Sequence, residues 1–199
     1  MPKSPAPRLP APSVGRVLTP QAQTLRVAGR TLLAGERLDM AALAQDVGVN
    51  RTTLYRWFGS RDQLVADALW SLADRTFDHL ERDLPDDGQA VAPRLVAEYA
   101  LVVIEHPGIR AFLGHDSAYA FTLLTGRRFG YHSRLVARIL GLLRKDHAAG
   151  LLTVGGDVAL EDLAYTSARI IEVYAHAFEL TGEAADGDRA RRVLRALLR

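Results

Sequence analysis

The chain has 199 residues, of which 48% are hydrophobic and 24% are charged, and it contains no cysteine. These values are typical of a globular protein, and the missing cysteines exclude disulfide bonds, thiol nucleophiles, iron–sulfur clusters and zinc sites with cysteine ligands. No apolar run is long enough to cross a bilayer, and the N-terminus lacks the continuous apolar segment of a secretory signal. We therefore expect a cytoplasmic protein without a membrane partner.

The basic residues are concentrated at the N-terminal end, although the net charge is only +2. Residues 1–64 hold nine Lys and Arg against four Asp and Glu, a distribution that suits contact between this end and a polyanion. Six of the nine prolines lie in the first twenty residues, which predicts a disordered tail over 1–18. Two interpretations of the tail stay open: a basic arm that follows a DNA backbone, and a solvated segment without a partner.

From Thr19 onward, apolar residues recur at spacings of three and four, which predicts consecutive helices and an all-α fold. Each of the first three predicted helices begins after a residue whose side chain can cap it, namely Thr19, Asp39 and Asn50. Gly48 and Gly59 predict the ends of the second and third helices. Ser60 and Gln63 form a capping box, which predicts the start of a long helix that reaches about Asp83.

Further helices are predicted over 92–106, 107–113, 117–124, 127–149, 157–180 and from 185 to the C-terminus. The helix over 92–106 is apolar on nearly every side, so we expect it at the centre of the fold. Glu98 is the only charged residue in its apolar stretch. Because a buried carboxylate is costly without a partner, Glu98 either pairs with an internal Arg or His or faces a ligand cavity.

Residues 38–58 predict a helix-turn-helix, that is, two short capped helices joined by a tight glycine turn. In the second of these helices, Leu54 and Phe58 are spaced to pin one face to the domain. The remaining faces carry side chains that suit phosphate oxygens or base edges, namely Arg51, Thr52, Thr53, Tyr55, Arg56 and Trp57. Arg61 stands at the N-terminus of the next helix, where the helix dipole favours a phosphate.

The segment from Leu43 to Leu64, LAQDVGVNRTTLYRWFGSRDQL, resembles the DNA-binding signature of TetR-family transcriptional regulators. The side chains that this resemblance implies at base edges are Arg51, Thr52 and Arg56. Those that it implies at the phosphate backbone are Thr53, Tyr55, Trp57 and Arg61, the last replacing the usual lysine. The chain departs from the family pattern at Met40 and Ala41, which are apolar where many relatives present polar groups, so we expect little base readout from the first helix of the pair.

The resemblance also implies an N-terminal helix-turn-helix domain of three helices over 19–60 and a helical ligand-binding and dimerisation domain over 61–199. A homodimer would place two recognition helices in successive major grooves of a palindromic operator. The apolar stripe predicted for the dimer interface comprises Leu163, Ser167, Ile170, Ile171, Tyr174, Phe178 and Leu194. The alternative is that this stripe is an ordinary core face within one chain.

An effector pocket is implied between the helices of the second domain. The candidate lining residues are Trp70, Glu98, Tyr99, Val103, Phe112, Tyr119, Phe121, Phe129 and His132, with plain core packing as the alternative for each aromatic. The region around residues 50–72 is similar to a subgroup that controls degradation of quorum-signal lactones. This similarity implies a lactone or acyl-type effector.

No residue pattern points to catalysis or to a bound metal. Gly130 to Ser133 is not a nucleophile elbow, Asp186 to Asp188 lacks the other ligands of a calcium loop, and the histidines lack ligand spacing. We expect no catalytic residue, no metal and no cofactor. The sequence thus predicts a repressor that leaves its operator when a small molecule binds. The alternatives are a small-molecule-binding protein on the same scaffold without operator binding, and an all-α enzyme.

Overall fold

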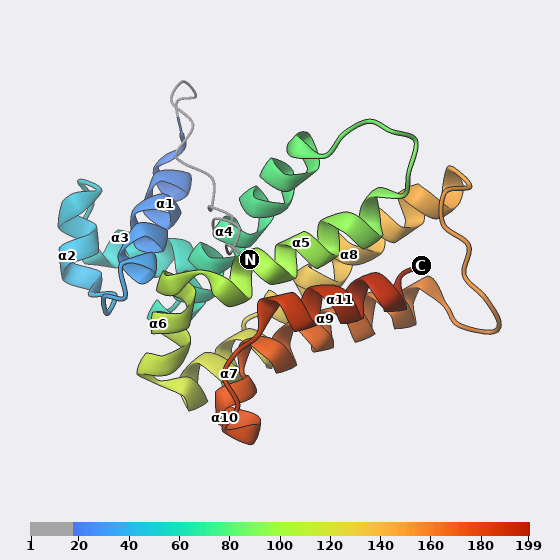
Figure 1. Ribbon diagram of the computed structural model, residues 1–199. Coiled ribbons are helices and arrows are strands. Elements are labelled where there is room, and N and C mark those ends of the chain that lie inside the picture. Colours follow the sequence, from blue (N-terminus) through green and yellow to red (C-terminus); the bar gives the residue numbers. More distant parts are fainter. Residues whose placement is uncertain (1–17) are drawn as a thin grey trace. The chain divides into compact units, whose positions relative to one another are not determined.

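The computed structural model describes residues 18–199, so the predicted tail lies outside the described residues except for Leu18. Within this part the chain forms helices and no strands, which confirms the predicted all-α class (Figure 1). The helices are α1 (Pro20–Leu33), α2 (Met40–Asp46), α3 (Arg51–Phe58), α4 (Arg61–Asp83), α5 (Val91–Glu105), α6 (Pro107–His115), α7 (Ser117–Thr125), α8 (Tyr131–Ala148), α9 (Leu160–Ala175), α10 (Ala177–Thr181) and α11 (Gly187–Leu197). None of these helices combines the length and apolar character that crossing a bilayer requires.

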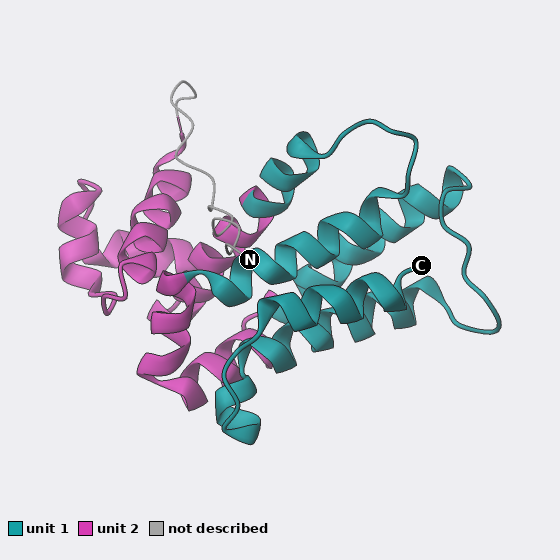
Figure 2. Cartoon of the chain, in the orientation of Figure 1, with its two compact units in different colours: residues 1–9, 76–106, 132–199 teal, residues 10–75, 107–131 magenta. Residues whose placement is uncertain are grey.

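The described chain divides into two compact units (Figure 2). The N-terminal unit comprises residues 18–75 and 107–131, with α1 to α3, the first part of α4, α6 and α7. The C-terminal unit comprises residues 76–106 and 132–199, with the rest of α4, α5 and α8 to α11. The sequence predicted a DNA-binding domain over 19–60 and a ligand-binding and dimerisation domain over 61–199. These assignments concern function, which the division into compact units does not test, so they stay predictions.

The predicted N-caps of α1, α2 and α3 are confirmed. In each case the cap side chain accepts a backbone N–H of the first turn: Thr19 from Ala22 at 3.3 Å, Asp39 from Ala41 and Ala42 at 2.8 Å, and Asn50 from Thr53 at 2.8 Å. The bonds from Ala42 and Ala41 lower the pKa of Asp39. These caps satisfy donors that a helix cannot satisfy itself, so they determine where the three helices begin.

The capping box at the start of α4 is formed only in part. Ser60 Oγ accepts the Gln63 N–H at 3.0 Å, as predicted. In a complete capping box the Ser60 N–H would also donate to the Gln63 side chain, and this part of the prediction is wrong, because Ser60 N donates to Phe58 O at 2.9 Å. The Gln63 amide instead donates to Asp67 Oδ1 at 3.1 Å and to the Phe129 carbonyl at 3.3 Å. Gln63 therefore connects α4 to the segment after α7 within the N-terminal unit.

A glycine allows α6 to approach the end of α1 within the N-terminal unit. A Cβ placed on Gly108 would lie 2.0 Å from the carbonyl oxygen of Leu33, a distance that no real side chain tolerates. Only glycine fits at this crossing of backbones. The contact places α6 and the following α7 beside the loop that joins α1 to α2, and this arrangement forms a cavity described below.

The C-terminal unit is built around α5, as the apolar sequence of this helix predicted. Leu95, Val96 and Ile104 are buried, and α5 packs against both α9 and α11. Tyr99 is 1% exposed and stacks on Phe77 of α4 with ring centroids 4.0 Å apart. The predicted central position of α5 is thus confirmed. This position explains why the helix has no exposed polar stripe.

Two predicted helices differ from the observed ones. The helix predicted from 127 begins at Tyr131, because Gly130 has a left-handed backbone with a φ of 72° that ends any helical run. The helix predicted over 157–180 begins at Leu160 and is interrupted at His176, where φ is −102° and ψ is 20°. Apolar periodicity continues across the interruption, so the sequence pattern did not reveal it.

Candidate DNA-binding surface

The predicted helix-turn-helix is formed by α2 and α3 within the N-terminal unit. Gly48 supplies the turn with a φ of 72°, and Val49 N donates back to Ala44 O at 2.9 Å. Leu54 is completely buried and anchors the inner face of α3. Phe58 is only half-buried and meets Trp57 edge-on, so Leu54 is the main anchor.

The outer face of α3 remains accessible within its unit. The exposed side chains are Arg51, Thr52, Tyr55 and Arg56, and the half-buried ones are Thr53 and Trp57. A short helix that exposes two arginines and a tyrosine has the donors that phosphate oxygens and guanine edges accept. The start of α2 presents few polar groups, because Met40 is 4% exposed and its neighbours Ala41 and Ala42 have no polar side-chain atoms.

Arg51 and Tyr55 form a pair on this face. Arg51 Nη2 donates to Tyr55 Oη at 3.2 Å, and the guanidinium carbon lies 5.5 Å from the tyrosine ring centroid. The hydrogen bond to Tyr55 raises the pKa of Arg51. Tyr55, one helical turn after Arg51, thus orients the guanidinium group of Arg51.

The Thr53 hydroxyl is occupied within the cap of α3. Asn50 Oδ1 accepts both the backbone N–H and the hydroxyl of Thr53, at 2.8 Å and 3.0 Å. The hydroxyl must therefore rotate away from Asn50 before it can donate to a phosphate oxygen. Its predicted phosphate contact stays a prediction.

Arg61 is bound to its own chain. Its Nε donates to the Leu38 carbonyl at 2.9 Å, and its Nη1 lies 3.5 Å from Tyr119 Oη and 3.6 Å from Asp62 Oδ1. Tyr119 Oη in turn donates to Asp62 Oδ1 at 2.9 Å. Burial, with this bond to Asp62, raises the pKa of Tyr119 to about 12. Arg61 thus joins α4 to the residue before the α2 cap and to α7, a role that the sequence did not reveal.

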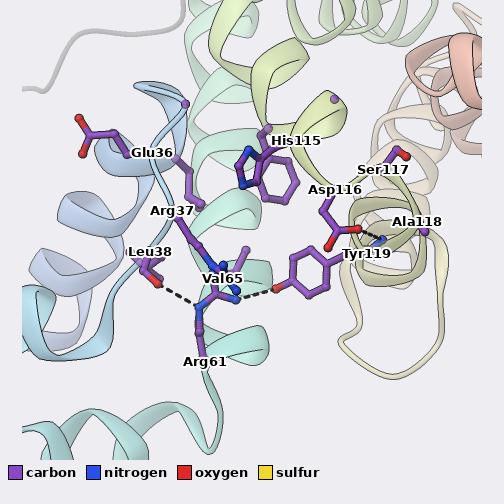
Figure 3. Close-up of a pocket in the computed structure, with 14 residues that line it drawn as sticks. Glu36, Arg37, Leu38, Arg61, Val65, His115, Asp116, Ser117, Ala118 and Tyr119 are labelled. Carbon is purple, nitrogen blue, oxygen red and sulfur yellow. Dashed lines mark hydrogen bonds between the residues drawn. The ribbon is translucent and has the colours of Figure 1, made fainter.

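A cavity of about 470 Å³ lies beside Arg61 within the N-terminal unit (Figure 3). Its walls are the loop between α1 and α2, the start of α4, and the end of α6 with the start of α7. Phe112 and Tyr119, which were predicted as pocket residues, line this cavity, and the other predicted pocket residues do not. Sequence reasoning missed Arg37, which lies in a loop without periodicity, and His115, which is the last residue of α6.

Most of the other predicted pocket residues have structural partners or are exposed. Tyr99 stacks on Phe77 in the core, Trp70 meets Tyr131 edge-on, and Val103 is half-buried. Phe121 is 40% exposed, and Phe129 is buried with its carbonyl bonded to Gln63. For Tyr99, Trp70 and Phe129 the plain packing alternative describes the observed contacts.

Glu98 pairs with arginines, as one alternative predicted, but these arginines lie at the surface rather than in the interior. Its Oε1 accepts from Arg195 Nη2 at 2.7 Å and lies 3.7 Å from Arg191 Nη1, both on α11. The side chain is 26% exposed, so it lies at the edge of the core. The two ion pairs attach α11 to the side of α5.

His132 also has a polar partner within the C-terminal unit. Its Nδ1 lies 2.7 Å from Glu172 Oε1, and Arg169 Nη1 lies 2.7 Å from Glu172 Oε2. Because Glu172 is 6% exposed, the two basic partners compensate the cost of burying its carboxylate. This cluster is a structural link between α8 and α9. Among residues 18–199, no group of three or more metal-ligating side chains comes together.

Three of the seven residues of the predicted dimer stripe are buried, three are half-buried and one is exposed. Ser167, Ile171 and Leu194 are buried inside the C-terminal unit, so their side chains are core rather than free surface. Leu163, Ile170 and Tyr174 are half-buried, and Phe178 is 69% exposed on α10. The apolar side chains that remain exposed on α9 and α11 are Tyr165, Val173 and Val193. The period of the stripe was correct, but sequence alone did not show which side of it faces α5.

The known proteins to which this chain is similar belong to one family. Residues 87–199 match the family model described as "Tetracyclin repressor-like, C-terminal domain". The fold is similar to that of the R. erythropolis transcriptional repressor QsdR from the TetR family, with 26% identity, a TM-score of 0.75, and coverage of 90% of this chain and 94% of that one. A TetR transcription regulator from Haloarcula marismortui ATCC 43049 shares the fold at 18% identity and a TM-score of 0.57, over 89% of this chain and 96% of that one. No curated protein sequence matches the chain.

Proposed function

The chain belongs to the TetR family of DNA-binding transcriptional regulators, and we propose that it is a repressor that a small-molecule effector releases from a palindromic operator. The observation that carries this proposal is the exposed face of α3, held outward by the buried Leu54. Arg51, Thr52 and Arg56 are assigned to base edges. Thr53, Tyr55, Trp57 and Arg61 are assigned to the phosphate backbone, which positions the helix in the major groove.

Operator binding requires two copies of α3 in successive major grooves about 34 Å apart, so the active form is a homodimer. We assign the dimer interface to the exposed apolar side chains of α9, α10 and α11 rather than to the buried part of the predicted stripe. These side chains are Tyr165, Val173, Phe178, Leu180 and Val193. Pairing them with the same side chains of a second copy would remove them from water and give a twofold interface.

Release follows if the effector binds better to a conformation that does not fit the operator. The affinity for DNA then falls by the coupling free energy, typically about 1 to 3 kcal/mol. A lactone or acyl compound is the effector class that the sequence resemblance favours. A small-molecule-binding protein without operator binding would share the scaffold but would not need the cationic face of α3.

The test is selection of duplexes from a random DNA pool by the full-length protein, followed by titration of a selected duplex at increasing salt. We expect a palindromic consensus and an affinity that falls steeply between about 50 and 200 mM salt, because phosphate contacts release counterions. Absence of duplex binding at low salt would overturn the proposal in favour of the small-molecule-binding alternative.

A further inference from the structure

Two arginines of the N-terminal unit lie close together where α1 packs on α4. A Cβ on Gly29 of α1 would lie 3.2 Å from the Leu72 side chain of α4, so the two helices are in close contact there. Arg26 lies one turn before Gly29, and Arg75 lies one turn after Leu72. Burial, and then the positive charge of Arg26, lower the pKa of Arg75. Two like charges therefore meet at the edge of this helix contact.

Both arginines keep hydrogen-bond donors that residues 18–199 do not use. Arg26 Nε is buried and has no hydrogen-bond partner. Arg75 Nε donates to the Ser71 carbonyl at 3.0 Å, which orients the guanidinium group and leaves its two terminal nitrogens without a hydrogen bond to the described residues. Both arginines are half-buried. A buried donor without a partner is costly, and a bound water or ion is one way in which folded proteins satisfy it.

No carboxylate compensates the two positive charges within the part of the chain that the structure describes. The sequence contains no Asp or Glu before Glu36, so α1 and the residues before it supply none. On α4, Asp74 lies about 100° round the helix from Arg75, and Asp78 already accepts Arg138 Nη2 at 2.7 Å. No carboxylate opposes the shift in the pKa of Arg75. The two arginines thus offer their charge and their free donors to an anion from solution.

We propose that Arg26 and Arg75 bind a small oxyanion of the phosphate type, which links α1 to α4. A guanidinium group donates parallel hydrogen bonds to two oxygens, and a tetrahedral oxyanion has enough oxygens to accept from two such groups. Arg75 lies about 21 Å along α4 from Arg61, the residue assigned to a DNA phosphate, so the ion is a free one rather than part of the DNA backbone. The proposal does not depend on the proposed function.

The first experiment measures binding of inorganic phosphate to the full-length protein by calorimetry, at an ionic strength kept constant with sodium chloride. We expect saturable binding to the wild type. Arg26→Gln and Arg75→Gln should each weaken this binding at least about tenfold, because charged hydrogen bonds are lost. Arg82→Gln removes an exposed arginine near the end of α4 and is the matched control, which should bind phosphate as the wild type does.

The second experiment compares thermal unfolding in phosphate and in chloride at equal ionic strength. Phosphate should raise the melting temperature of the wild type and of Arg82→Gln, because a ligand that binds only the folded state stabilises it. Arg26→Gln and Arg75→Gln should lose most of this rise. The site would be overturned if the wild type bound no phosphate, or if the two variants bound phosphate and responded to it as the control does.

The third experiment separates a free ion from a phosphate of DNA. In phosphate-free buffer, Arg26→Gln and Arg75→Gln should bind a selected duplex as tightly as Arg82→Gln does. Weaker duplex binding by both variants, without phosphate binding by the wild type, would assign the two arginines to the DNA backbone and overturn the free-ion site. If the wild type binds phosphate but no duplex at all, the proposed function fails while the oxyanion site stands.

Discussion

His132 Nδ1 lies 2.7 Å from Glu172 Oε1 and joins α8 to α9 within the C-terminal unit, where Arg169 completes the pairing of the buried carboxylate. Glu172→Ala leaves His132 and Arg169 without this partner, so we expect a loss of about 2 to 3 kcal/mol in the free energy of unfolding. Urea denaturation measures this loss in the free energy of unfolding. Glu161→Ala is the control, because Glu161 pairs with Arg144 and both side chains are more than half exposed, so its loss should destabilise the protein far less than Glu172→Ala does.

Gly108 should not tolerate a methyl group, whereas another helical glycine should. In Gly108→Ala the new Cβ meets the Leu33 carbonyl, and either α6 or the end of α1 must move. We expect a loss of several kcal/mol, about the range of other strongly destabilising substitutions. In Gly141→Ala the new methyl meets no atom within 4 Å, and the variant should be about 0.5 to 1 kcal/mol more stable than the wild type. Thermal unfolding of the two variants separates these outcomes, and equal melting temperatures would contradict the close approach of α6 to α1.

Arg56→Ala should relax base preference more than it weakens contact with DNA in general. Arg56 is exposed on the outer face of α3, where a bidentate contact to guanine contributes about 1 to 3 kcal/mol of discrimination. The measurement compares the affinities of the variant for the selected duplex and for a scrambled one. Arg82→Ala removes an exposed arginine at the end of α4 and should leave the ratio of the two affinities unchanged. A ratio that Arg56→Ala leaves equal to that of the wild type would remove this residue from the base-reading set.

Val173→Glu should break the homodimer. Val173 is 52% exposed on α9, and a carboxylate there would be buried against its own copy across a twofold interface. Sedimentation equilibrium should give a monomer for this variant and a dimer for the wild type. Thr153→Glu adds the same charge at an exposed position between α8 and α9 and should remain dimeric. A dimeric Val173→Glu variant would place the interface elsewhere on the surface.

The stability should fall in mild acid, in part through His176. Burial lowers the pKa of His176 below its ordinary value of 6.5, against an opposing effect of Glu179. Below pH 6.5 the unfolded chain takes up a proton that the folded chain excludes at this ring, so the free energy of unfolding decreases as the pH falls from 6.5 toward the folded pKa. His176→Gln should lose less stability than the wild type between about pH 7.5 and 5.5 in urea denaturation. Equal losses in both proteins would show that His176 does not contribute. His106, whose pKa burial also lowers, accounts for a remaining decrease in the variant.

The starts of the first three helices were predicted correctly from their capping residues. Thr19, Asp39 and Asn50 cap their helices through bonds to N–H groups two or three residues away, and such bonds depend on short stretches of sequence alone. The inward Leu54 and the exposed arginines of α3 follow from helical spacing in the same way. The exposed face of α3 could therefore be predicted from the sequence.

The partners of Glu98 and Arg61 depend on contacts between distant parts of the chain. Glu98 meets Arg195, ninety-seven positions later in the chain, and Arg61 meets Tyr119, fifty-eight positions later. No periodicity encodes such pairs, because each depends on how whole helices pack.

The helical class, the helix starts at the N-terminal end and the exposed polar face of α3 could be predicted from the amino-acid sequence, since they depend on neighbours within one or two turns. The core face of α9, the pairing of Glu98 and the cavity lined by Arg37, Arg61, Phe112 and Tyr119 emerged only in the folded chain. Burial and cavity formation depend on how segments from distant parts of the chain fill the same volume.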